Sequence, residues 1–455
     1  MPAALYSSIS SRRTCLAIVL AAGFGARMRS ARPKALHKIA GRSMLAHVLA
    51  AILKAGADRI VVVVGPNQEA LIKEAKTVVP GVEIAIQVER LGTAHAVLAA
   101  RGHIAVGYDD IIVAFADTPL VRPDTFALMR GALADGSNAI VALGFEAKDP
   151  TGYGRLMLKD GALEAIREDR DASEQERRVR TCNAGLMALA GRHALGLLEA
   201  IDAENSQREF YLTDAVAIAR AQKLAASALI VAEDEVLGVN DRAQLAAAEA
   251  LLQARLRAEA MREGATLIDP SSVTLAFDTK LGCDVVVEPN VVFGPGVAVG
   301  AGSLIRSFSH LEGATVGEDA TIGPFARLRP GADLGKEVHI GNFVEVKAAT
   351  VGAGAKINHL SYIGDASVGA KTNIGAGTIT CNYDGFGKFR TEIGEGAFIG
   401  SHSALVAPVK IGDGAYIGSG SVITRDVASD ALAVARERQI EKAGWAKSFR
   451  KKNQK

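Results

Sequence analysis

The C-terminal part of the chain places an aliphatic residue at every sixth position, and this period constrains the fold more than any other feature. Helices repeat near 3.6 residues and strands near two, so neither explains it. A solenoid that turns a corner after each short strand does, because each aliphatic side chain then points into a stacked core while Gly, Asn and Asp take the corners. Two runs carry the pattern: Val316, Ile322, Leu328, Leu334, Ile340 and Val346, then Ile393, Ile399, Leu405, Ile411, Ile417 and Ile423.

These repeats resemble the hexapeptide family, which implies a left-handed parallel β-helix over roughly residues 266–426 and, as in most members, a homotrimer. The period breaks after Ile374, at GTITCNYDGFGKFRTE, and resumes at Ile393. Insertions that leave a regular solenoid are usually surface loops, and on repeat proteins they tend to lie on the binding face. We therefore expect this loop to contact a ligand.

The N-terminal part, residues 14–240, alternates short apolar runs such as RIVVVVG with helical stretches such as SMLAHVLAAILKAG. This alternation predicts an α/β domain with a Rossmann-like parallel sheet, whose ligands should bind at the carboxyl ends of the strands. Residues 241–264 contain strong helix formers and end at Gly264, which predicts a connecting helix. Residues 265–455 then form the β-helix domain with a C-terminal tail.

The two ends of the chain carry positive charge. Residues 1–13 are expected to form a disordered extension; an export signal is the alternative, but CLAIVLAA is short for one and fits a strand that is buried on both faces. The basic end after Trp445, AKSFRKKNQK, is expected to be solvated and disordered.

Composition limits the class of partner. Lys and Arg number 52 against 50 Asp and Glu, a net charge of +2 that argues against nucleic acid or a membrane surface and favours small-molecule substrates. The longest apolar run is far shorter than the ~20 residues of a membrane helix. The cysteines have no CxxC spacing, which indicates a reducing, cytoplasmic location: Cys15, Cys182, Cys283 and Cys381.

The stretch from Leu20 to His37, LAAGFGARMRSARPKALH, follows the first predicted strand. It matches neither a P-loop nor a dinucleotide fingerprint. However, LAAG-x-G-x-R-M followed by PK-x-LH resembles the signature of sugar-nucleotide pyrophosphorylases. This resemblance implies a turn that holds the phosphates of UTP, with Arg27 and Lys34 as catalytic cations. The turn residues are Leu20, Ala21, Ala22 and Gly23, and the chain departs from the usual family residues at Phe24, Ala26 and Ala116.

Further segments resemble the same family in the same order along the chain: QVERLGTAHA, FADTPL, TGYGR, REDRDA, TCNAG and GVND. Taken singly, Asp117 could merely cap a turn and Lys34 could be a surface charge, but together the segments favour a site. The resemblance implies in-line attack of a sugar 1-phosphate on the α-phosphate of UTP. It places Gln87, Gly92 and Thr93 at the uracil, Asp117 and Asn240 on Mg²⁺, and Gly154, Glu168 and Asn183 around the hexose.

The combination of both halves resembles the bifunctional bacterial enzymes that make UDP-N-acetylglucosamine, over about Thr14 to Trp445. In that family the β-helix transfers an acetyl group from acetyl-CoA to glucosamine 1-phosphate, and the product, N-acetylglucosamine 1-phosphate, feeds the uridyltransferase. His359 would be the general base. The resemblance assigns the sugar phosphate to Arg329, Lys347, Tyr362 and Asn373, and acetyl-CoA to Ala376, Asn382, Tyr383, Ser401, Ser419 and Arg436.

Three alternatives compete with this interpretation. One is a pyrophosphorylase with a single activity whose β-helix is regulatory or structural, and another is a scaffold whose repeats bind partners. His359 and the NYDG loop argue against the first, and the pair Asp117 and Asn240 argues against the second. The third is a zinc site of the kind found in hexapeptide carbonic anhydrases, formed by His339, His359 and His402.

Overall fold

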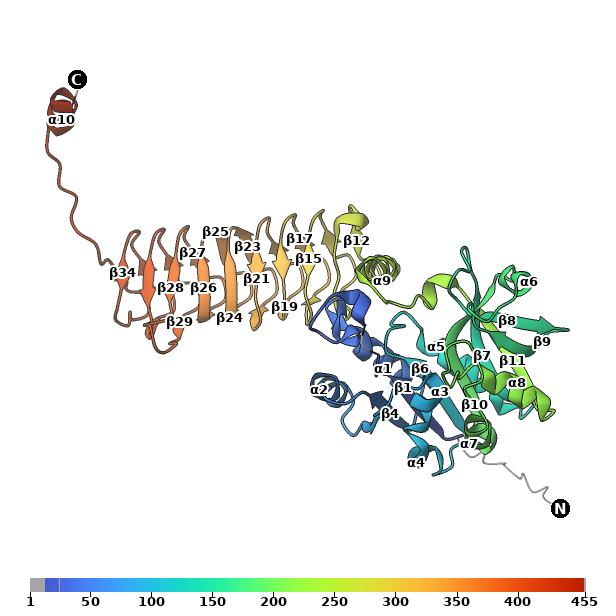
Figure 1. Ribbon diagram of the computed structural model, residues 1–455. Helices are drawn as coiled ribbons and strands as arrows, with labels where there is room; N and C mark the ends of the chain where they lie inside the picture. Colours follow the sequence, from blue (N-terminus) through green and yellow to red (C-terminus); the bar gives the residue numbers. More distant parts are fainter. Residues whose placement is uncertain (1–12, 24, 454–455) are drawn as a thin grey trace, which may run out of the picture. The chain divides into compact units, whose positions relative to one another are not determined.

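The computed structural model describes residues 13–23 and 25–453 (Figure 1). The chain forms two compact units that meet between Leu252 and Gln253. The first contains a mixed sheet flanked by helices, and the second is a solenoid of short parallel strands. The predicted α/β domain and left-handed parallel β-helix are confirmed.

The central strands of the first unit are parallel, and one antiparallel strand, β10, lies between β6 and β7. The order across the sheet is β11-β7-β10-β6-β1-β4-β5, with β8 and β9 attached beside β10. The strands are β1 Cys15–Leu20, β4 Arg59–Val64, β5 Glu83–Ile86, β6 Asp110–Phe115, β7 Asn138–Glu146, β8 Arg155–Lys159, β9 Ala162–Arg167, β10 Thr181–Ala190 and β11 Ala225–Val231, with β2 Lys38–Ile39 and β3 Arg42–Ser43 in a separate hairpin.

Strand β1 is buried on both faces, as its uninterrupted apolar run predicts. Cys15, Ala17 and Val19 point into one apolar cluster, and Leu16 and Ile18 point into another on the opposite face. Burial raises the pKa of the Cys15 thiol to about 12, so this cysteine behaves as a core residue. The helices of the first unit before Arg242 are α1 Met44–Lys54, α2 Glu69–Val78, α3 Thr93–Leu98, α4 Arg101–Ile104, α5 Pro123–Ala134, α6 Glu174–Arg177, α7 Gly191–Glu199 and α8 Asp214–Ala221.

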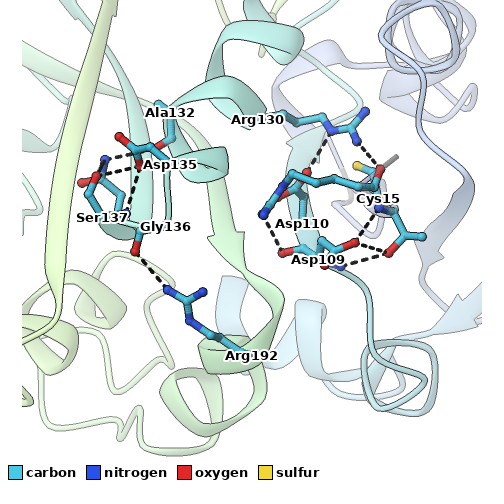
Figure 2. Close-up of polar contacts among 12 residues, drawn as sticks. Cys15, Asp109, Asp110, Arg130, Ala132, Asp135, Gly136, Ser137 and Arg192 are labelled. Carbon is cyan, nitrogen blue, oxygen red and sulfur yellow. Dashed lines mark hydrogen bonds and ion pairs between the residues drawn. The ribbon is translucent and has the colours of Figure 1, made fainter. Parts of the chain in front are cut away.

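A network of ion pairs and hydrogen bonds lies at the edge of the sheet where β1 and β6 begin (Figure 2). The Asp110 side chain is 1% exposed and pairs with Arg13 Nη2 at 2.5 Å and Arg130 Nε at 3.1 Å. Arg130 also donates to the Arg13 carbonyl at 2.9 Å, and Asp109 accepts the Thr14 N–H at 2.7 Å. Arg13 is therefore anchored to the sheet, although it belongs to the predicted disordered extension; the rest of that prediction, residues 1–12, lies outside the described residues.

The second unit stacks coil upon coil, and every strand pairs in parallel with the next coil. One face carries β12 Thr266–Leu267, β14 Val286–Val287, β17 Leu304–Ile305, β20 Thr321–Ile322, β23 His339–Asn342, β25 Lys356–His359, β27 Asn373–Ile374, β30 Phe398–Ile399, β33 Tyr416–Ile417 and β35 Leu432–Ala433.

The other two faces are joined through two long strands, β24 Glu345–Val351 and β26 Tyr362–Val368, which run across both. One face adds β13 Lys280–Leu281, β16 Ala298–Val299, β19 Ala314–Val316, β22 Ala332–Leu334, β29 Thr391–Ile393 and β32 Val409–Ile411. The other adds β15 Val292–Phe293, β18 His310–Leu311, β21 Arg327–Leu328, β28 Ile379–Cys381, β31 Ala404–Val406 and β34 Val422–Ile423.

The six-residue pattern marks the core of this unit, since each aliphatic residue of both predicted runs is buried in a single cluster. The interruption is narrower than predicted, because β28 continues the regular coil before the chain leaves it. The excursion then carries an antiparallel bridge between Tyr383 and Lys388. Beyond it the register resumes, with Ile374 beside Ile399.

Phenylalanines occupy successive corners of the solenoid and form a ladder, defined here as Phe308, Phe325 and Phe343. Each adopts a left-handed backbone, with φ of 61°, 56° and 56°. The rings stack at centroid distances of 5.1 and 5.2 Å. The side chains remain 45–55% exposed, so a large apolar surface lies open along this corner.

Helix α9, Arg242–Arg262, matches the predicted connecting helix, but both units use it as part of their own structure. Ala248 packs with Ile39 and Met44 in the first unit. In the second unit, Leu256 packs on the solenoid core, and the buried Gln253 amide exchanges hydrogen bonds with Leu275 at 2.7 and 2.9 Å. The unit boundary therefore falls within the helix.

The prediction of a disordered basic end is wrong for most of its length. Residues Trp445–Asn453 form helix α10, which follows Gly444 and contains neither Gly nor Pro. Its basic residues Arg450, Lys451 and Lys452 lie in the last turn, where their positive charges interact favourably with the negative end of the helix dipole. None of its residues is buried, as expected for a solvated segment.

The network around Asp110 generates a prediction about stability. Asp110→Ala removes the shared partner of Arg13 and Arg130 and should lower the free energy of unfolding of the first unit by about 3 kcal/mol, measured by chemical denaturation. The control is Asp135→Ala, which removes an exposed carboxylate that bonds only Ser137 (Figure 2) and should cost less than about 1 kcal/mol. Equal losses in the two variants would contradict the role given to Asp110.

Candidate active sites

A cavity of about 310 Å³ opens at the carboxyl edge of the first unit's sheet, where β1 and β6 end. This is the place that the α/β topology predicts for a ligand. Sequence-predicted residues form much of its wall: Leu20, Ala21, Ala22, Gly23, Lys34, Gln87, Gly92, Thr93 and Asp117. The rest of the wall is Ala35, Arg90, Ala96, Phe115, Ala116 and Glu209.

The turn after β1 is held by its neighbours on both sides. The Ala21 N–H donates to the Val63 carbonyl at 2.8 Å, and the Leu20 carbonyl accepts the Ala116 N–H at 3.0 Å. Ala116 is itself buried against the cavity, whereas the prediction for Phe24 lies outside the described residues. These backbone bonds leave a turn that presents main-chain groups to the cavity, as a phosphate site requires.

Gly25 allows the turn and Lys34 to approach each other. Its φ is 62°, and a β-carbon at this position would lie 2.6 Å from Lys34 Cβ, so only glycine fits. Arg27 and Ala26 belong to the short 3₁₀ segment that follows, Ala26–Met28, and both are exposed. Arg27 has no hydrogen-bond partner among the described residues, and it does not line the cavity.

Lys34 brings together two predicted metal ligands from distant parts of the chain. Its ammonium bonds Asp117 Oδ2 in a short ion pair and lies 3.1 Å from Asn240 Oδ1. One cation therefore already stands between a carboxylate and an amide oxygen. Oxygen donors that converge on a single charge suit a hard divalent cation such as Mg²⁺, so these residues fit the metal that the sequence implies.

Gln87, Gly92 and Thr93 form one connected group at the cavity. The buried Gln87 amide donates to the Gly92 carbonyl at 3.2 Å. Gly92 has φ of 120°, and a β-carbon there would lie 2.5 Å from the Phe210 carbonyl oxygen, so this position requires glycine. Thr93 Oγ1 accepts the Leu212 N–H at 2.9 Å.

The segment Asn205–Thr213 therefore supports this part of the site, although the sequence analysis did not identify it. Phe210 and Leu212 act through main-chain groups, which leave no sequence signal. Thr213 also donates its hydroxyl to Glu168 at 3.1 Å, so the segment links two of the predicted groups.

The predicted hexose residues lie beside one another across β8, β9 and β10. The Asn183 N–H donates to the Gly154 carbonyl at 2.8 Å, at an irregularity in the pairing of β10 with β7. Glu168 directly follows β9, and burial raises the pKa of its carboxyl group, which nearby acidic groups raise further. Neither Glu168 nor Asn183 lines the 310 Å³ cavity, so these residues form a separate part of the site.

In the second unit, positive side chains gather where the inserted loop returns to the solenoid. Lys388 lies against Lys347, and the Lys347 ammonium group lowers the pKa of Lys388 below its usual value. Arg329 Nη1 pairs with Glu345 at 2.8 Å, and this contact raises the pKa of Arg329. Two ammonium groups side by side favour an anionic ligand. Lys388 was not predicted, because only the fold places it beside Lys347.

Asn382 and Tyr383 lie on the same loop. The buried Asn382 amide donates to Asp365 in a short bond and reaches the Tyr362 hydroxyl at 3.5 Å. Tyr383 is 61% exposed and donates its hydroxyl to the Gly385 carbonyl at 2.6 Å. The loop thus presents a fixed amide and an exposed aromatic ring beside the basic residues.

His359 ends strand β25 and is exposed. Its Nδ1 lies 2.9 Å from Asn342 Oδ1, on the strand of the preceding coil. Because an amide oxygen only accepts, this contact favours the tautomer with the proton on Nδ1, and in that neutral ring the lone pair lies at Nε2. No hydrogen bond joins His359 to the basic cluster among the described residues.

Apart from Asn382 and Tyr383 on the loop, the predicted acetyl-CoA residues follow one corner from coil to coil. The column begins beside His359, whose carbonyl accepts the Gly377 N–H. In the next coils, the Ala376 carbonyl accepts the His402 N–H at 2.7 Å, and the Ser401 carbonyl accepts the Gly420 N–H at 2.8 Å. The Arg436 side chain passes 3.6 Å from where a β-carbon on Gly420 would lie. Asn373 and Ser419 neighbour this column, which forms an extended track.

The alternative zinc site does not form in the described part of the chain. No three side chains of His, Cys, Asp or Glu converge there as metal ligands, although His339, His359 and His402 all lie in the solenoid. In the same residues, no helix has the length and apolar character needed to cross a membrane.

Comparisons with known proteins assign a family to both units. The chain is 60% identical over 440 residues to "Bifunctional protein GlmU" of Azorhizobium caulinodans, which covers 97% of this chain and 98% of that protein. The same name belongs to relatives in Xanthobacter autotrophicus, 61% identical over 440 residues with 97% and 98% coverage, and in a Bradyrhizobium species, 60% identical over 438 residues with 96% and 98% coverage. The profile of the MobA-like NTP transferase domain matches residues 17–214, and that of the bacterial transferase hexapeptide (six repeats) matches residues 313–348 and 390–425.

The paired lysines generate a prediction about anion binding. Lys388→Met should weaken the binding of glucosamine 1-phosphate about tenfold if the lysine pair receives the phosphate, because it removes one of the two charged donors; calorimetry measures the loss. Lys410→Met is the control, since Lys410 is an exposed lysine that pairs with Glu392, and it should leave binding unchanged.

The lowered pKa of Lys388 adds a pH dependence. In the wild type, affinity should fall as the pH rises through that pKa, since Lys388 then loses its charge. In Lys347→Met this fall should move to higher pH, because the neighbouring ammonium that lowers the pKa is gone. A pH profile that is identical in the two proteins would contradict the pairing of the lysines.

Proposed function

The chain belongs to the GlmU family of bifunctional proteins, and on that premise we propose how its residues divide two reactions between the two units. It acetylates glucosamine 1-phosphate with acetyl-CoA, and it transfers UMP from UTP to N-acetylglucosamine 1-phosphate, which gives UDP-N-acetylglucosamine and pyrophosphate. The bifunctional relatives match over both units, so a single-activity pyrophosphorylase with a structural β-helix does not describe the chain.

The main support for assigning one reaction to each unit is that each unit contains a polar site of its own. UTP occupies the cavity of the first unit, with its phosphates at the turn Leu20–Gly23 and its uracil at Gln87, Gly92 and Thr93. The cavity volume of about 310 Å³ and its position at the ends of β1 and β6 support this placement. Gly154, Glu168 and Asn183 hold the sugar, with the Glu168 carboxylate available to accept from a sugar hydroxyl.

Asp117 and Asn240 would hold Mg²⁺ by their side-chain oxygens, and the bound ion would supply positive charge to the phosphates of UTP. The contact of Lys34 with both oxygens supports this assignment, because it shows that the two side chains can serve one cation.

Lys34 and Arg27 contribute positive charge to the uridylyl transfer. An oxygen of the sugar 1-phosphate attacks the α-phosphorus of UTP in line, the new O–P bond forms, and the bond to the departing pyrophosphate breaks. The chain needs no nucleophile of its own, so these residues position the reactants and stabilise the charge that develops. Lys34 lies in the cavity wall, whereas Arg27 is exposed on the segment just beyond the turn.

His359 is the general base of acetyl transfer. The amine of glucosamine 1-phosphate attacks the thioester carbonyl of acetyl-CoA, the C–N bond forms, the C–S bond breaks, and coenzyme A leaves as the thiolate. His359 Nε2 takes the amine proton, a role supported by the contact of Nδ1 with Asn342, which orients the ring and favours the neutral tautomer whose lone pair lies at Nε2. A histidine titrates near neutral pH and suits this task.

The remaining β-helix residues hold the two substrates of acetyl transfer. Arg329, Lys347, Tyr362 and Asn373 bind the sugar phosphate, assisted by Lys388 from the loop. Acetyl-CoA follows the track along the corner, where Ala376, Ser401, Ser419 and Arg436 contact it, and Asn382 and Tyr383 contact it from the loop. The positive charge of the lysine pair and the continuity of the track support this arrangement.

The protein acts in the cytoplasm as a homotrimer that joins through the β-helix units. All its cysteines are free of disulfides, which fits a reducing compartment. The exposed ladder Phe308, Phe325 and Phe343 supports association, since exposed apolar surface of this extent favours contact with another chain.

The division of labour predicts that the two activities can be removed separately. Asp117→Ala should lower uridylyl transfer at least about a hundredfold and spare acetyl transfer, because it removes a metal ligand. His359→Ala should lower acetyl transfer about a hundredfold or more and spare uridylyl transfer, because it removes the base. Each variant is the control for the other, and loss of both activities in a folded variant would refute the proposal.

The trimer proposal predicts a threefold native mass, measured by light scattering. Phe325→Glu should shift the protein toward monomers, because it buries a charge in the contact between chains. Asp333→Asn on strand β22, an exposed change away from the ladder, should leave the mass unchanged. A monomeric wild type at micromolar concentration would contradict the assembly.

A further inference from the structure

Arg90 lies in the wall of the nucleotide cavity, and none of the roles assigned above uses it. It belongs to the segment QVERLGTAHA, between Gln87 and Gly92. Its Nε donates a hydrogen bond to the Ala22 carbonyl at 2.9 Å. A side chain from the base-binding segment thus holds the turn that faces the phosphates.

This bond determines which way one peptide of the turn faces. The peptide unit is planar and trans, so the Ala22 carbonyl and the Gly23 N–H point in opposite directions. With the carbonyl fixed on Arg90, the Gly23 N–H points away from Arg90. Gly23 lines the cavity, and its N–H has no acceptor within the described residues, so it can donate to a ligand.

The structure also makes room for the guanidinium group. Gly65 directly follows β4, and a β-carbon there would lie 2.9 Å from Arg90 Nη2. The Gly65 backbone is outside the left-handed region, so alanine would meet no backbone strain at this position. Because Gly65 has no side chain, the Arg90 guanidinium group has room beside it.

We propose that Arg90 is a positioning residue of uridylyl transfer, which fixes the Ala22–Gly23 peptide so that the Gly23 N–H binds a phosphate of UTP. The inference rests on the nucleotide site proposed above. It assigns the effect to the N–H at Nε and not to the charge of the guanidinium, because Nε is the atom that bonds Ala22.

Two substitutions separate the donor from the charge. Arg90→Gln keeps an N–H at the position of Nε, because both side chains carry nitrogen on Cδ, but removes the charge. Arg90→Met places a methyl group there and keeps neither. Arg90→Met should lower kcat/KM for UTP about tenfold, mainly through KM, whereas Arg90→Gln should stay within about twofold of wild type. KM for N-acetylglucosamine 1-phosphate should change in neither variant.

Gly65→Ala tests the same contact from the other side. In the wild-type background, its new methyl group should displace the guanidinium and raise KM for UTP in the direction of Arg90→Met. In the Arg90→Gln background it should have no further effect, since the displaced atom Nη2 is missing. The four proteins form a double-mutant cycle on one contact.

The outcomes distinguish this inference from the function on which it rests. Equal losses in Arg90→Gln and Arg90→Met would show that charge matters, and no loss in Arg90→Met would show that the contact does not matter; either result overturns the role of Nε. Wild-type protein that fails to transfer UMP would overturn the uridyltransferase site itself, and the inference with it. Unchanged thermal unfolding of each variant excludes a general loss of structure.

Discussion

The contact of Lys34 with Asp117 and Asn240 is the interaction on which the proposed nucleotide site depends. It joins the 3₁₀ segment Lys34–Leu36, the loop that follows β6 and the segment that precedes helix α9, three parts of the chain that lie far apart in the sequence. Gly25 permits it, since any larger residue would collide with Lys34. This positive group, held between two oxygens, lies at the position proposed for the phosphates and the metal.

The two units build their sites by different means. The first places polar groups on turns at the carboxyl edge of a buried sheet, so its site is made by segments distant in sequence. The second repeats one coil, and residues at the same corner of successive coils become neighbours. His359 and Asn342 meet for this reason, because their strands pair in register. The inserted loop then supplies Lys388 beside Lys347, which regular coils do not provide.

The sequence predicted the fold well because its periods reflect burial directly. Ile322 and Ile340 occupy the solenoid core, and Leu16 and Ile18 face one side of the sheet, as their patterns require. Contacts made through the backbone were missed: the Phe210 carbonyl beside Gly92 leaves no mark on residue choice at position 210. Lys388 and Arg90 were missed for another reason, since their roles depend on neighbours that only the fold supplies. Helix α10 was not predicted, because the basic composition of this segment suggested disorder although it contains neither Gly nor Pro.

The central claim, that one chain carries out both reactions, is tested most directly by mass spectrometry of its sugar products. Purified protein is incubated with glucosamine 1-phosphate, acetyl-CoA, UTP and Mg²⁺, and then with each reagent left out in turn. The account predicts UDP-N-acetylglucosamine from the complete mixture and accumulation of N-acetylglucosamine 1-phosphate when UTP is omitted. Uridylyl transfer to supplied N-acetylglucosamine 1-phosphate without any acetylation of glucosamine 1-phosphate would contradict it.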